Sequence, residues 1–276
     1  MRSFSLGVAL AAVAVASPLS AQTWQAIGTP NNTNTGAYWN NRSDDNVGSA
    51  VCNVGAILTN TPALTAGSCS NQAPVYIPLN PAPLTTSSFF LGGAAGSNPG
   101  GFGFNCVVAC SVNLLGRVAG NTNTSWGVVT SGGSVFTAAQ LAGGATVSGT
   151  FAVWITQALP MAGAGTIFTS GQSTFAGGVF TANSNQQFAA FSATALSTTA
   201  GVFGTIINVG QGRVYVGMED NVNGGRGFGP AGAGFPSDRD YNDILVSIQA
   251  VPEPATIGLM GFGLLALAGI AKRRKA

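Results

Sequence analysis

Residues 145–156 read ATVSGTFAVWIT, and the alternation within this stretch decides the fold class. Successive side chains of an extended chain point to opposite faces, so the stretch has two distinct sides. One side carries Val147, Phe151, Val153 and Ile155, with Gly149 between them, and the other carries Ser148, Thr150, Ala152, Trp154 and Thr156. This period of two predicts a β-strand over residues 147–155 that is buried on its apolar face.

The same strand signal recurs on both sides of this stretch. Apolar runs suit strands at residues 107–115, 186–196, 201–209 and 213–219, and alternation returns at Val214, Val216 and Met218 and at Ile244, Val246 and Ile248. Gly-Gly pairs separate these runs, and only residues 137–142 suit a short helix. Many short strands joined by Gly-rich turns predict a mainly β chain, folded as an antiparallel β-sandwich or jelly roll.

The expected sandwich core covers residues 105–250. Residues 22–104 are rich in Asn, Thr, Pro and Gly, which favour loops and edge strands. Within this part, residues 28–46 should be loop, anchored to the core by Trp24, Tyr38 and Trp39, and residues 92–105 should be a flexible connector.

The first residues of the chain have the layout of a secretory signal peptide, residues 1–21. Arg2 is followed by an apolar run from Leu6 to Ala16 and then by small residues up to Ala21. The alternative is an N-terminal anchor, but the apolar run is too short to span a bilayer comfortably.

The body between the two ends, residues 22–250, is almost uncharged. It contains no Lys and no His, and Ser, Thr, Asn, Gln and Gly supply its polarity. A nucleic-acid-binding surface needs a basic patch, so no nucleic-acid partner is expected. Catalysis is not expected either, because there is no His to act as a base and no G-x-S-x-G motif.

Four cysteines, Cys52, Cys69, Cys106 and Cys110, all lie in this exported body. An even number of cysteines in an oxidising compartment favours disulfides. Four cysteines allow three pairings, and the sequence does not choose among them; we favour Cys52–Cys69 and Cys106–Cys110, because each closes a local loop. A metal site is the alternative, but it has no His and no CxxC spacing to support it.

Five of the body's acidic residues fall close together near its end, and they suggest a calcium site. The candidate ligands are Glu219, Asp220, Asp238, Asp240, Asn242 and Asp243. Oxygen ligands at alternate positions of an extended chain point to one side, which suits a hard cation such as Ca²⁺. The EF-hand pattern is not met, and the alternative is an ordinary turn in which Arg226 or Arg239 neutralises the carboxylates. The stretch also resembles an acidic DxDYND segment that is frequent near the C-terminus of bacterial exported surface proteins.

The last 26 residues form the most specific stretch of the chain. Val251-Pro252-Glu253-Pro254 precede an uncharged apolar segment, residues 255–271, and the cations Lys272, Arg273, Arg274 and Lys275 follow it. The apolar segment has 17 residues, at the lower limit for a helix that spans a bilayer, and the terminal cations favour a cytoplasmic C-terminus.

This tail, residues 251–276, resembles the PEP-CTERM sorting signal of Gram-negative bacteria. The resemblance implies transient insertion in the inner membrane, recognition by the sorting enzyme exosortase, cleavage near the motif, and transfer to the cell surface or extracellular matrix. Proteins with such tails are often linked to exopolysaccharide or biofilm, and share the low-Lys, Ser/Thr/Asn/Gly-rich composition of this body.

The sequence therefore predicts an exported, non-enzymatic protein of the cell surface or extracellular matrix. The alternative is a carbohydrate-binding or adhesive module with a structural calcium ion. That alternative requires an exposed aromatic platform, for which Trp24, Trp39, Trp126 and Trp154 are candidates.

Overall fold

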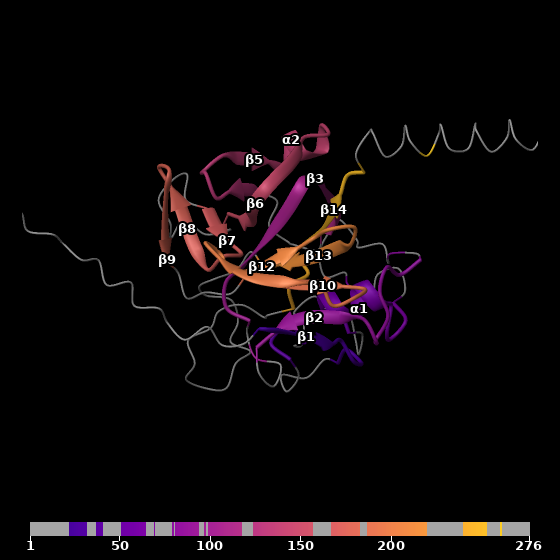
Figure 1. Cartoon of the computed structure of the whole chain (residues 1–276). Helices are drawn as coiled ribbons and strands as arrows, with labels where there is room; N and C mark the ends of the chain where they lie inside the picture. The colour runs from indigo at the N-terminus through magenta and orange to yellow at the C-terminus, as the bar shows by residue number, and fades with distance from the viewer. Residues whose placement is uncertain are drawn as a thin grey trace, which may run out of the picture.

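The computed structural model describes residues 22–31, 37–40, 51–64, 69, 79, 81–93, 97, 99–117, 124–156, 167–182, 187–219, 240–252 and 260. Its elements, shown in Figure 1, are β1 (Thr23–Ala26), α1 (Val54–Thr59), β2 (Phe89–Gly92), β3 (Phe102–Arg117), β4 (Trp126–Thr130), β5 (Val135–Thr137), α2 (Ala138–Ala142), β6 (Thr146–Ile155), β7 (Ile167–Thr169), β8 (Ser173–Ala176), β9 (Val179–Ala182), β10 (Phe188–Ser192), β11 (Thr198–Gly201), β12 (Gly204–Asn208), β13 (Arg213–Met218) and β14 (Ile244–Ala250). The mainly β class predicted from the sequence is confirmed, and so is the short helix near residues 137–142.

The described strands form one curled, connected sheet. Its main path runs β1-β2-β10-β13-β14-β3-β6-β7-β8-β9, with β4, β5, β11 and β12 attached to the side. Neighbouring strands in this described part run antiparallel, except that β12 lies parallel to β3. This strand order does not by itself define the sandwich or jelly roll expected from the sequence.

Strand β6 carries the predicted apolar face and buries much of the opposite face as well. Val147, Phe151, Val153 and Ile155 are at most 1% exposed and lie in the largest core cluster. Ala152 and Trp154, on the other face, pack with Phe175 and Phe203 in a separate cluster. The second half of β6 is therefore buried on both sides, because later strands cover the face that the sequence assigned to the surface.

Strands β10, β13 and β14 are also buried on both faces. Val214 and Val216 point into the largest cluster, whereas Tyr215, between them, points into a second cluster. This second cluster includes Val54 and Ile57 of α1. Figure 1 shows α1 with β1 and β2 beside these central strands.

Tyr38 and Trp39 attach the N-terminal part to this second cluster, and Trp24 packs against the largest cluster, so the three predicted anchors contact the core. Trp39 is fully buried, and its ring lies 5.5 Å from that of Phe90 and 5.3 Å from that of Phe191. The expectation of a connector over residues 92–105 is wrong for its last part. Strand β3 already begins at Phe102, because Phe102 and Phe104 are fully buried in the largest cluster.

Candidate functional site

The chain leaves the folded body at the end of β14, next to an irregularity in β3. Ala250 lies opposite Cys110, and the Val251 backbone N–H donates to the Ala109 carbonyl oxygen at 2.9 Å. Pro252 has no N–H, so it cannot donate a further hydrogen bond to β3. We call Ala250, Val251 and Pro252 the tail junction.

The irregularity in β3 is a β-bulge closed by a disulfide. Cys106 lies opposite Gly149 and Cys110 opposite Val147, so residues 107–109 of β3 face the single residue Ser148 of β6. Cys106 and Cys110 are bonded to each other, with their Cα atoms 5.9 Å apart. We call residues 106–110 the stapled bulge.

This bulge was not predicted from the sequence, although the cysteine spacing contains a signal for it. Four residues of extended strand span about 13 Å, whereas a disulfide needs its two Cα atoms about 4.4–6.8 Å apart. A disulfide between Cys106 and Cys110 is therefore incompatible with a regular strand, so the favoured pairing already implied a local irregularity.

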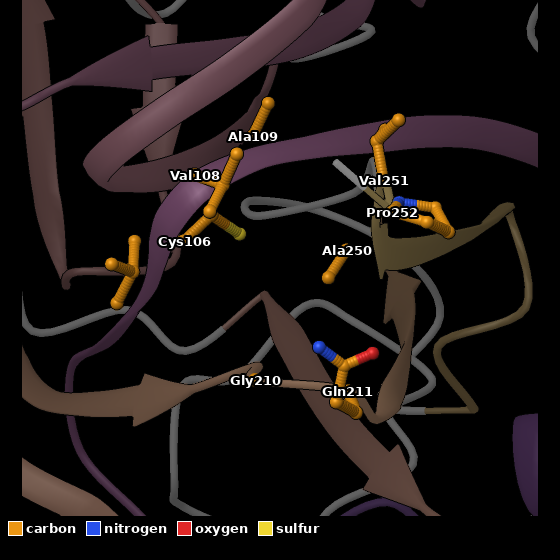
Figure 2. Close-up of a pocket in the computed structure, with 9 residues that line it drawn as sticks. Cys106, Val108, Ala109, Gly210, Gln211, Ala250, Val251 and Pro252 are labelled. Carbon is orange, nitrogen blue, oxygen red and sulfur yellow. The ribbon is translucent and has the colours of Figure 1, made fainter. Parts of the chain in front are cut away.

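A groove of about 200 Å³ lies between the stapled bulge and the tail junction. Figure 2 shows Val108 and Ala109 on one side, Val251 and Pro252 on the other, and Gln211 below them in this view. Val107 is 87% exposed and Val108 is 47% exposed, because the bulge turns them away from the core. The residues that line the groove are uncharged: Cys106, Val107, Val108, Ala109, Gly210, Gln211, Ala250, Val251 and Pro252.

The second candidate site is the acidic turn that precedes β14, residues 240–243. Asp240 and Asn242 are each 1% exposed. The Asn242 side-chain amide donates to Asp240 Oδ2 at 2.8 Å and to the Cys52 carbonyl oxygen at 2.7 Å. The Asn242 backbone N–H donates to Asp240 Oδ1 at 3.2 Å, and the Asp240 carbonyl oxygen accepts from the Val54 N–H at 2.8 Å. Asp240 and Asn242 therefore attach the start of α1 to the start of β14.

The predicted calcium ligands are only partly placed by the structure. Glu219 is buried beside Gln187, whose side-chain amide donates to the Glu219 carbonyl oxygen at 3.1 Å, while Asp243 is half-buried. Asp220 and Asp238 lie outside the described residues. Among the residues that the structure does describe, no three His, Cys, Asp or Glu side chains gather as a metal site. Calcium binding by this stretch stays a prediction.

Burial also affects a tyrosine that packs against the acidic turn. Tyr38 makes an edge-to-face contact with Tyr241, with 5.8 Å between ring centres, and its hydroxyl donates to the Leu91 carbonyl oxygen at 2.8 Å. Burial, with a smaller contribution from Tyr241, raises the pKa of Tyr38 well above its ordinary value. Tyr38 is therefore neutral across the physiological pH range.

The four cysteines form the local pairs favoured from the sequence. Cys52 is bonded to Cys69, with their Cα atoms 5.3 Å apart, in addition to the pair in the stapled bulge. No cysteine is left free. The body has no free thiol to serve as a nucleophile or metal ligand.

The four tryptophans do not form the exposed platform that the carbohydrate-binding alternative requires. Trp39, Trp126 and Trp154 are at most 7% exposed. Trp24 is half-buried, and its indole N–H donates to the Leu196 carbonyl oxygen at 2.7 Å. Stacking of sugars on an exposed tryptophan therefore has no support in this structure.

The fold and its tail junction define a β-rich, disulfide-bonded body joined directly to a C-terminal sorting segment. Residues 250–275 match the family model of the PEP-CTERM protein-sorting motif, as the sequence predicted. The match covers this tail and not the body, and the motif indicates an exported protein sorted by exosortase. No curated protein and no solved structure matches the chain.

Most of the tail lies outside the described residues. Val251, Pro252 and Met260 are described, whereas Glu253, Pro254 and the cations from Lys272 to Lys275 are not. The predicted signal peptide, residues 1–21, is also outside this part. Among the described helices, none has the length and apolar character needed to cross a membrane.

Proposed function

We propose that this chain is an exported, non-enzymatic structural protein of the cell surface or extracellular matrix of a Gram-negative bacterium. Exosortase would process it at the PEP-CTERM tail, after transient insertion of the tail in the inner membrane. The observation that carries this proposal is the match of residues 250–275 to the sorting motif, directly after the last strand of the body.

The chemistry of the body supports the exported destination. Both disulfides suit an oxidising compartment outside the cytoplasm. The chain has no histidine, and its cysteines are paired, so the usual general base and thiol nucleophile are missing. These features favour a structural role over catalysis.

The ends of the sheet support a matrix role through association with other chains. Strand β9 ends the main strand path, its sequence VFTA is uncharged, and Val179 is 63% exposed. Proteins that must stay monomeric usually protect such edges with charged residues, especially lysine. An uncharged strand at the end of the described strand path favours pairing with another copy or with an extended matrix component.

The curling of the sheet around one large core also supports the sandwich-like arrangement expected from the sequence.

Fractionation combined with C-terminal mass mapping tests the proposed sorting. The full chain is expressed in otherwise identical strains with and without exosortase. We expect the surface form to lack KRRKA when exosortase is present, and the intact chain to stay with the inner membrane when it is absent. A surface form with an intact C-terminus in both strains would overturn the proposal.

A further inference from the structure

The groove beside the stapled bulge lies within immediate reach of the sorting motif. The hydrogen bond from Val251 to Ala109 fixes the chain to the body one residue before Pro252. A fully extended chain advances at most about 3.6 Å per residue, so Pro254 lies within about 11 Å of Val251. An enzyme that binds the Pro-Glu-Pro motif would therefore lie close to the groove.

The groove has the surface chemistry of a docking site. Val107 and Val108 are exposed side by side, and the lining residues carry no charge. Covering such apolar side chains removes them from water, which favours association. The centre of a protein interface is typically depleted in charged residues, as this groove is.

The groove is also held in a fixed shape. The Cys106–Cys110 disulfide closes the bulge, and both cysteines are at most 2% exposed. Gly149, opposite Cys106, has φ +72°, a conformation that glycine adopts readily. The hydrogen bond from Val251 to Ala109 joins the start of the tail to the bulge. A preformed surface loses little conformational freedom when a partner binds.

We propose that the stapled bulge and the tail junction together form the surface on which exosortase docks when it takes the tail. The partner surface would be apolar and uncharged, and it would lie next to the part of the enzyme that binds Pro252 and the residues after it. This inference rests on the proposed function and adds a second recognition element, on the body, to the motif in the tail.

Pulse-chase labelling of the full chain in an exosortase-containing strain tests the docking surface. The variants are Val107→Asp and Val108→Asp, and the matched control is Val202→Asp. Val202 is 65% exposed in the turn before β12 and does not line the groove. We expect tail removal to be about tenfold slower in the two groove variants, as for a central interface residue, and unchanged in the control. Val107→Ile keeps an apolar side chain, so we expect its tail to be removed at the wild-type rate.

Equal rates of tail removal in wild-type, Val107→Asp and Val108→Asp chains would overturn the docking surface and leave the proposed sorting intact. Failure of the wild-type chain to be processed in any strain would overturn both. The disulfides of each variant are mapped, so that a slower rate counts as support only when both pairs have formed. The exosortase-free strain supplies the other comparison. Release of unprocessed Val107→Asp chain from the membrane there would show that the bulge contacts lipid, and would overturn docking on the enzyme.

Discussion

Substituting Asn242 by Asp separates the two interpretations of the acidic turn. Asn242 donates to both Asp240 Oδ2 and the Cys52 carbonyl oxygen. An Asp side chain has nearly the same shape but no amide hydrogens. Asp240 Oδ2 and the Cys52 carbonyl oxygen would then face another acceptor oxygen in place of a donor. Losing a hydrogen bond to a charged group costs about 1.5–3 kcal/mol, and leaving a buried carbonyl unpaired costs about 1–3 kcal/mol. We therefore expect the free energy of unfolding to fall by about 3 kcal/mol.

Thermal unfolding followed by circular dichroism measures this effect on the full chain in mild detergent, with and without Ca²⁺. A loss of about 3 kcal/mol corresponds to a Tm lower by roughly 6–12 °C for a body of this size. The matched control is Asn113→Asp, because Asn113 is exposed on β3. If Asn242 instead binds calcium, the added carboxylate should strengthen the site, and Ca²⁺ should raise the Tm of Asn242→Asp above that of the wild type. That result, or a Tm equal to that of the control, would refute the hydrogen-bonding role.

Three further variants test the packing around this turn. A side chain at Gly217 would meet the Tyr241 carbonyl oxygen, so Gly217→Ala should lower the free energy of unfolding by about 1–3 kcal/mol in urea titrations; an unchanged midpoint would contradict the close approach. Burial raises the pKa of Tyr38, so the stability due to its neutral phenol is complete below about pH 10 and is lost as the pH rises further. Tyr38→Phe should therefore weaken the loss of stability between about pH 9 and 11 in denaturation curves, and identical pH dependence in both proteins would contradict the raised pKa. The disulfide Cys52–Cys69 closes a separation of 17 residues, so replacing both cysteines by Ala should cost about 3 kcal/mol in the same urea assay, whereas a loss below about 1 kcal/mol would contradict this stabilising role.

The strands were largely predictable from the sequence because their apolar alternation is local. Val147, Phe151 and Val153 lie on one buried face because alternate residues of a strand point to the same side, which is also what produces their pattern in the sequence. Burial of the opposite face was not predictable in this way. Trp154 is covered by Phe175 and Phe203, which come from distant parts of the chain, and no local pattern reports such contacts.

The sequence predicted the sorting motif, but it did not predict the bulge or the role of the acidic turn. The PEP-CTERM motif was found because its spacing is specific, and the family match confirms it. The stapled bulge was read as part of a regular strand, because Val107 and Val108 look apolar enough for a core. The roles of Asp240 and Asn242 could not be chosen from sequence, since the same oxygen atoms suit a cation or a turn, and only tertiary structure brings the Cys52 carbonyl oxygen to the Asn242 amide.

The position of β14 makes the centre of the sheet depend on the last described strand of the body. This strand pairs with β13 on one side and with β3 on the other, so the centre of the sheet is incomplete without it. It is also the last described strand before the tail, so in a chain exported from its N-terminus β14 would be among the last parts of the body to emerge. Until then, β3 and β13 are left without the neighbour that joins them. The complete sheet can therefore form only after β14 is available to pair with both neighbours.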